Sequence, residues 1–262
     1  MKTKLTHAIT VAMMALGMVA TAEAGSMANA GPQFKAEEIV SFAKKVEKTV
    51  AAKGARVFIL SRVGRPANEL PEGIHYTHTA IGVYSMIKTA DGRQVPGYAI
   101  YNLYQREKQP DVSDLVVDYP IDFFAGVFEL KAGVVIPTPE LQQRLLQVIA
   151  SNTYKDLHNP KYSVIANPYN SKFQNCTEHT LDVINAAIYQ TGDVNKIKAN
   201  TNAYFDAQRV HVSPFKLLAG SIFMPDVKTS DQKNGIRTST YTTIAKYLDK
   251  YDLVQEQMLI TQ

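Results

Sequence analysis

The chain has 262 residues but contains only one cysteine and no tryptophan. A single cysteine excludes a framework of internal disulfides, so the core must be held together by packing. The thiol of that residue, Cys176, is therefore an inert buried sulfur, a link to another molecule or a nucleophile.

The chain also lacks a strong charge of one sign. Its 28 basic and 24 acidic residues give a formal net charge of +4, and both signs are spread along the sequence. Such a mild balance gives no reason to expect a nucleic-acid partner.

Long apolar runs are missing too, apart from a short one near the N-terminus. Two lysines precede an apolar stretch over residues 8–20, and the small-x-small motif Ala22-Glu23-Ala24 follows it. This pattern predicts a secretory signal peptide over residues 1–24, with a weaker second cleavage site after Ala30. An uncleaved anchor helix is the alternative, but the stretch is short for a membrane span. We therefore expect a periplasmic or secreted protein, with no transmembrane segment after cleavage.

The rest of the chain is expected to form a disordered lead-in over residues 25–33 and one domain over residues 34–262. Apolar periodicity, turn residues and capping signals predict a mixture of helices and strands in that domain. Helices are expected over residues 35–53, 138–152, 176–190 and 240–251, and strands over 57–60, 78–88, 98–105 and 133–136. Loops are expected over 61–73, 153–174 and 191–235, with a short apolar stretch at 217–223, and 114–128 fits no pattern. The elements alternate without a regular strand–helix rhythm, which favours an α+β fold.

Cys176 is expected at the first position of a helix. Asn175 is a good N-cap, and Glu178 three residues later completes a capping-box pattern. The sulfur would then lie near the free amides and the positive end of the helix dipole, which lowers the pKa of a thiol. The alternative is that Cys176 is a small core residue, as free cysteines often are.

A cysteine nucleophile needs a base, and His78 is the best placed histidine. It heads the strand predicted over residues 78–88, whereas His75 would point to the opposite face of that strand. His179 follows Cys176 on the same helix, and the remaining two histidines lie in predicted loops. A zinc site built from His75, His78, Cys176 and His179 is a competing possibility, although the first two face apart.

A third residue should orient the base. The Asp91-Gly92 turn predicts a hairpin in which residues 98–105 run back beside His78. Asn102 is the best choice there, because its amide can accept from an imidazole N–H without adding charge. Gln105 is the alternative.

The segment from Tyr76 to Tyr84 resembles the histidine strand of circularly permuted papain-like proteins, which include permuted NlpC-like enzymes and the lecithin:retinol acyltransferase group. Residues 175–179 look like the Asn-Cys block of the latter group. More extensively, the chain resembles a bacterial family known as domain of unknown function 2145. The stretches that carry this second resemblance are 61–64, the strand beginning at His78, 97–104, 118–124 and 174–183.

The resemblance to the papain-like proteins implies a fold in which an antiparallel sheet packs against a helix with the cysteine at its N-terminus. It also implies attack by Cys176, with His78 as base, on an amide, ester or thioester through an acyl-enzyme. The candidate oxyanion donors are the Cys176 backbone amide together with Gln174 or Tyr169.

We therefore expect an exported cysteine hydrolase or acyltransferase that acts on a cell-wall peptide or a lipid acyl group, without a metal or cofactor. One alternative is a non-catalytic periplasmic binding module that uses the Tyr-rich loops. Another is a metal-stabilised structural domain. Arg62 and Arg65, in the loop expected over 61–73, either bind anions or are ordinary loop residues, and the sequence favours the second without excluding the first.

Overall fold

A computed structural model describes residues 33–89, 91–211 and 226–262. The expected signal peptide, almost all of the expected lead-in and the apolar stretch at 217–223 lie outside these residues. No helix in the described part of the chain is long and apolar enough to cross a membrane.

The main element is a six-stranded sheet in the order β4-β3-β2-β1-β5-β8. Every pair of neighbouring strands is antiparallel, which confirms the predicted α+β class with an antiparallel sheet. The six strands are β1 (Val57–Val63), β2 (His78–Lys88), β3 (Gln94–Arg106), β4 (Gln109–Asp118), β5 (Glu129–Pro137) and β8 (Val254–Thr261). A separate pair is formed by β6 (Gln208–Val210) and β7 (Ile236–Thr238).

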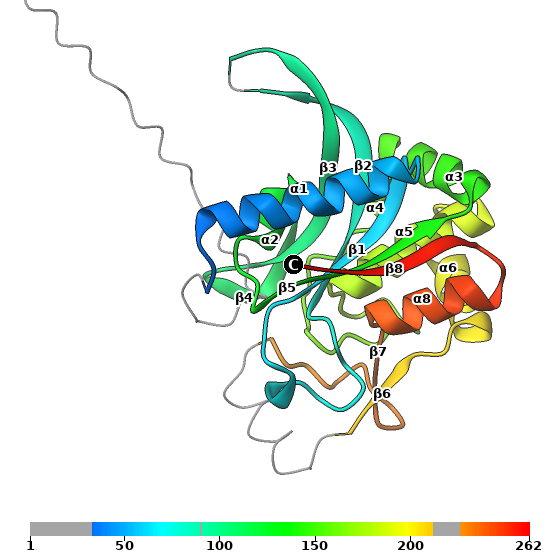
Figure 1. Ribbon diagram of the computed structural model, residues 1–262. Helices are drawn as coiled ribbons and strands as arrows, with labels where there is room; N and C mark the ends of the chain where they lie inside the picture. The colour runs from blue at the N-terminus through cyan, green and yellow to red at the C-terminus, as the bar shows by residue number, and fades with distance from the viewer. Residues whose placement is uncertain (1–32, 90, 212–225) are drawn as a thin grey trace, which may run out of the picture.

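Helices cover both faces of the sheet, so side chains that alternate along each strand enter two different cores. One core packs the sheet against α1 (Ala36–Ala52) and α2 (Pro120–Phe124). The other packs it against α3 (Pro139–Ala150), α5 (Cys176–Tyr189), α6 (Val194–Tyr204) and α8 (Tyr241–Lys250). The short helices α4 (Thr153–Asp156) and η1 (Ala67–Glu69) complete the set of described helices. Figure 1 shows α1 crossing the sheet in blue, with the β2–β3 hairpin extending past it.

The hairpin of β2 and β3 contains the feature that positions the site. The two strands pair from Lys88 and Gln94 as far as Ile81 and Tyr101. Beyond Ile81, residues 78–80 pair with β1 alone. The sheet therefore opens between β2 and β3 at the end where His78 lies.

Several elements differ from the predictions. The predicted loop over 61–73 is wrong at its start, because β1 continues to Val63 between two neighbouring strands. The region 114–128 contains the end of β4 and all of α2, and the expected loop over 191–235 contains α6. β8, which was not predicted, follows the last predicted helix and pairs along the length of β5.

Candidate active site

Cys176 is the first residue of α5, and the predicted N-cap is confirmed. The Asn175 side-chain oxygen accepts from the Glu178 amide at 2.9 Å, and its Nδ2 donates to the Val164 carbonyl at 3.0 Å. The predicted capping box is wrong, because the Glu178 carboxylate does not return to the cap. It is buried and lies 2.7 Å from the Lys198 ammonium, a stronger partner than a backbone amide.

The Cys176 sulfur lies where β2 and β3 separate. The residue is 7% exposed and packs against Leu103 of β3 and Tyr162. Backbone N–H groups of Thr79 and Thr177 lie close enough to stabilise a thiolate and so act to lower the pKa of Cys176. Thr79 directly follows His78, so the sulfur lies beside the backbone that carries the candidate base.

The net direction of the Cys176 pKa is nevertheless upward. Burial is the largest cause and raises it, while the backbone amides and the Arg62 guanidinium act in the opposite direction. The expectation of a lowered pKa is therefore wrong: the helix terminus contributes, but desolvation of the charged form outweighs it. The resting group is a neutral thiol.

The structure brings His78 and Asn102 together. His78 Nε2 lies 2.9 Å from Asn102 Oδ1, across the opening between the two strands. Asn102 Nδ2 donates to Asp118 Oδ1 at 2.6 Å and to the Ile100 carbonyl at 3.2 Å, which fixes the orientation of the amide. Because the amide oxygen faces the ring, the neutral imidazole must carry its proton on Nε2. Its Nδ1 is left with a free lone pair, and this buried atom has no hydrogen-bond partner among the described residues.

Asp118 and Tyr104 extend this arrangement, and neither was predicted. The Tyr104 hydroxyl donates to Asp118 Oδ2 at 2.8 Å, and its ring stacks on His78 with centroids 4.8 Å apart. Burial raises the pKa of Asp118 to about 7, although Tyr104, Arg62 and Asn102 act to lower it. The feature that could have identified Asp118 is the hairpin of β3 and β4. Its register pairs Asp118 with Ile100, two residues from Asn102.

Arg62 is a buried residue of β1, not a loop residue as predicted. It is 3% exposed, pairs with His78 in the strand register, and donates to the Phe123 carbonyl. Its guanidinium carbon lies 5.0 Å from the Phe123 ring centroid and 5.8 Å from that of Tyr104. Arg65 lies beyond the end of β1, in the segment predicted as loop.

The environment of His78 keeps its ring neutral. Burial, followed by the charge of Arg62, lowers the pKa of His78 to about 3, while the Asn102 hydrogen bond acts in the opposite direction. The ring also lies against Phe123 of α2, with centroids 5.6 Å apart. The site therefore combines a neutral thiol with a neutral imidazole.

His78 and Cys176 approach the opening in the sheet from different sides. His78 contacts residues of the α1/α2 face, whereas Cys176 comes from α5 on the other face. Among the described residues, no hydrogen bond joins the two side chains. Hydrogen bonds of this kind are often long before substrate binds, so the pair remains a candidate dyad.

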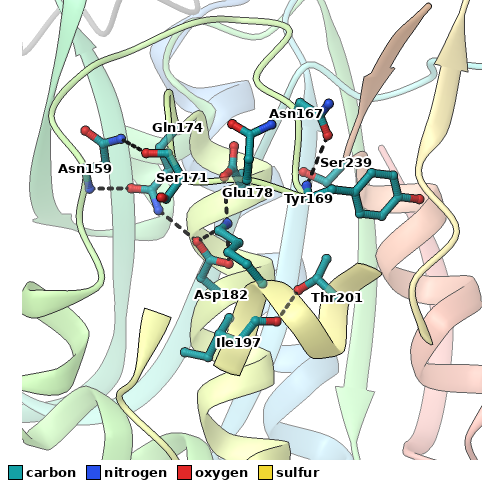
Figure 2. A network of polar contacts seen from close by, with 12 residues as sticks. Asn159, Asn167, Tyr169, Ser171, Gln174, Glu178, Asp182, Ile197, Thr201 and Ser239 are labelled. Atoms are coloured by element: carbon teal, nitrogen blue, oxygen red, sulfur yellow. Dashed lines mark hydrogen bonds and ion pairs between the residues drawn. The ribbon is translucent and has the colours of Figure 1, made fainter. Parts of the chain in front are cut away.

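Gln174 has no free donor to offer an oxyanion. Its Nε2 donates to the Leu157 carbonyl and to Asp182 Oδ2, both at 3.0 Å, and its Oε1 accepts from the Asn159 amide. Figure 2 shows Gln174 beside the carboxylates of Asp182 and Glu178. Both carboxylates accept from the buried Lys198 ammonium. The predicted oxyanion role of Gln174 does not fit these contacts.

Tyr169, the other candidate oxyanion donor, and Gln105, the alternative partner for His78, also have their polar groups bound elsewhere. The Tyr169 hydroxyl donates to the Phe205 carbonyl and accepts from the Ala207 amide, each at 3.0 Å, and Figure 2 shows it pointing away from the Asp182 cluster. Gln105 donates to the Pro110 carbonyl at 2.7 Å within the turn of β3 and β4. Neither is placed for the role considered for it.

The remaining histidines do not gather around Cys176. His75 and His211 are exposed. His158 Nε2 lies 3.0 Å from the Ser113 hydroxyl, and the His179 ring packs edge-on against Tyr154. Within the described ranges, no group of three or more His, Cys, Asp or Glu residues could hold a metal ion.

Comparison with known proteins gives one match. A family model described as "Uncharacterized protein conserved in bacteria (DUF2145)" matches residues 49–248, a range that includes His78, Asn102, Asp118 and Cys176. No curated protein and no solved structure matches the chain. The predicted kinship with papain-like enzymes stays a prediction.

Proposed function

This chain belongs to that bacterial family, DUF2145, and from this premise we propose that it is an exported cysteine hydrolase or acyltransferase. The family description names no activity, so the proposal depends on the site. One observation carries it: the contact of His78 Nε2 with Asn102 leaves Nδ1 unprotonated and without a partner, beside the strand segment that adjoins the Cys176 sulfur. A base of fixed tautomer, on the strand residue that precedes the backbone contact of a helix-start thiol, is suited to acyl transfer.

The proposed reaction begins with attack of Cys176 on a carbonyl carbon. As the sulfur–carbon bond forms, His78 Nδ1 takes the thiol proton and the carbonyl π electrons move to oxygen. Collapse of this intermediate breaks the bond to the leaving nitrogen, oxygen or sulfur, and His78 returns the proton to the leaving atom. Water, or an alcohol or amine acceptor, then attacks the thioester, and the proton that it loses passes through His78 to the departing sulfur.

The proposed substrates are amides, esters or thioesters of the cell envelope, such as a cell-wall peptide or a lipid acyl group. The signal-peptide pattern over residues 1–24 supports export. The Cys176 backbone amide at the start of α5 remains the best oxyanion donor, because the side chains of Gln174 and Tyr169 have other partners.

Trapping the acyl-enzyme tests this proposal. Intact-mass measurement after incubation with 4-nitrophenyl acetate, and separately with an acyl thioester, should show one added acyl group on Cys176. The adduct should be absent in Cys176→Ser and form at least about 100-fold more slowly in His78→Gln. The matched control is His75→Gln, which changes an exposed histidine three residues away and should leave the rate unchanged.

A non-catalytic binding module is the second candidate, and burial of the sulfur favours it. Cys176 is 7% exposed and burial raises the pKa of its thiol, which suits an inert core residue. If the folded protein forms no acyl adduct and Cys176 reacts with iodoacetamide only after unfolding, this second function replaces the first.

A further inference from the structure

Arg62 is a buried cation that forms no ion pair with any carboxylate in the described part of the chain. It is 3% exposed, yet no Asp or Glu of the described residues lies within ion-pair range of its guanidinium. The stretch 212–225, outside those residues, contains no acidic residue in its sequence. Buried charges in proteins are normally paired, because removing a charge from water is costly.

The contacts that Arg62 makes with described residues satisfy only part of its hydrogen-bonding capacity. The Phe123 carbonyl accepts one of its five N–H groups, and the rings of Phe123 and Tyr104 offer their faces to the cation. The carboxylate of Asp118 is bound instead by Asn102 and Tyr104. Since burial raises the pKa of Asp118 to about 7, its negative charge is incomplete at neutral pH. Asp118 therefore cancels the charge of Arg62 only in part.

This charge acts on the candidate site. Arg62 pairs with His78 in the register of β1 and β2, and Cys176 lies beside the next residue of β2. Burial raises the pKa of the Cys176 thiol, and the guanidinium acts against this rise; burial lowers the pKa of His78, and the guanidinium adds to that effect. Both groups therefore lie within its field. In a poorly solvated site such a field is weakly screened.

We infer that Arg62 makes the Cys176 site selective for anionic reaction partners, so that the substrate carries a carboxylate or another negative group close to the carbonyl that is attacked. The statement about the substrate rests on the proposed function, whereas the preference of the sulfur for anions does not. Arg62 acts through its charge and is a specificity residue in this scheme.

Two alkylating reagents of similar size but different charge measure the field directly. Iodoacetate and iodoacetamide both react with the thiolate, so the ratio of their rate constants at one pH does not depend on the thiol pKa. We expect this ratio at Cys176 to exceed that of N-acetylcysteine amide by on the order of tenfold. In Arg62→Met the ratio should fall to the reference value, and Arg62→Lys should retain most of it because the positive charge remains.

Arg65→Met is the matched control, because it removes a charge from the segment after β1, three residues away. Its ratio should equal that of the wild type. A wild-type ratio equal to the reference, or an elevated ratio that survives in folded Arg62→Met, would overturn the inference. If Arg62→Met does not fold, the inference is tested by the rate ratios of the wild type and of Arg62→Lys, both of which should exceed the reference.

A pair of esters separates this inference from the proposed function. 4-Nitrophenyl hemisuccinate and 4-nitrophenyl valerate have acyl groups of similar length, but only the first carries a carboxylate. Faster acylation of Cys176 by the hemisuccinate supports both proposals. Acylation without a preference refutes the inference alone, and an anionic preference in alkylation without any acylation refutes the proposed function alone.

Discussion

At the scale of single residues, the orientation of one amide decides what His78 can do. Asn102 can present its oxygen to the ring only while its nitrogen has acceptors on the other side. Asp118 and the Ile100 carbonyl supply these acceptors. The tautomer of His78 is therefore set by Asp118, a residue that does not contact the ring through a hydrogen bond.

Replacing Asp118 with Ala should release that orientation. Without the carboxylate, the Asn102 amide can turn over, and the His78 ring should populate both neutral tautomers instead of the Nε2–H form alone. Nitrogen-15 NMR of the histidine rings reports this directly. The Tyr104 hydroxyl also loses its acceptor, so we expect a stability loss of about 1–3 kcal/mol in urea unfolding.

The matched control is Asp122→Ala, which removes an exposed carboxylate from α2 close by. It should leave a single His78 tautomer. A single Nε2–H tautomer in Asp118→Ala as well would show that Asp118 does not position the base.

The site residues that could be predicted from the sequence are those that belong to a local pattern, such as a strand start or a turn. His78 begins a strand, and the Asp91-Gly92 turn predicts a hairpin that returns residues 98–105 towards it. The contact with Asn102 forms beyond the last paired residues, Ile81 and Tyr101. Arg62 carried no such signal, because Gly64 and Pro66 punctuate the segment after it and predict a loop. Its strand continues because β2 and β5 pair with it on both sides. The guanidinium contacts the carbonyl and ring of Phe123, more than 60 positions along the chain, and no local pattern encodes these partners.

At the scale of elements, α5 is held from two directions. The N-cap residue, Asn175, donates to the Val164 carbonyl and, at 3.3 Å, to the Thr238 hydroxyl of β7. The side of α5 contacts α6, where Lys198 lies 2.7 Å from both Glu178 and Asp182. These contacts position the first turn of the helix, which carries the sulfur.

Replacing Lys198 with Met should destabilise the protein by about 3–5 kcal/mol, because the carboxylates of Glu178 and Asp182 would lose their buried cation. Urea unfolding followed by circular dichroism measures the change. Lys196→Met on the same helix is the control, since that side chain is exposed, and it should change stability by less than about 0.5 kcal/mol. Equal effects of the two substitutions would contradict a stabilising role for the buried cluster.

The edge strands show where pattern reading fails at this scale. Central strands such as β1 are buried throughout and give continuous apolar runs, which the sequence displays. β4 and β8 lie at the two edges of the sheet and contain many polar residues. Their pairing partners decide their conformation, and β5 precedes β8 by more than a hundred residues. A pattern confined to one segment cannot supply that information.

At the scale of the whole molecule, the candidate site joins the two cores. His78 contacts the α1/α2 side and Cys176 starts a helix of the other side, so the pair can meet only where β2 and β3 part. Both cores also bury histidines as neutral rings. Burial lowers the pKa of His78 to about 3, and burial followed by His158 and Lys198 lowers the pKa of His179 to about 3.

These buried rings make global stability depend on pH, and His179 allows the test without touching the candidate dyad. Between pH 6.5 and 3 the unfolded chain protonates this histidine while the folded chain does not, so acid favours unfolding by about 1.4 kcal/mol per pH unit. His179→Leu should therefore gain about 2 kcal/mol relative to the wild type when the pH falls from 7 to 5, measured by urea unfolding at both values. His211→Leu, at an exposed position, is the control. A stability difference between His179→Leu and the wild type that stays constant with pH would mean that the folded protein protonates His179 as readily as the unfolded chain, and that this ring is not desolvated in the α5 core.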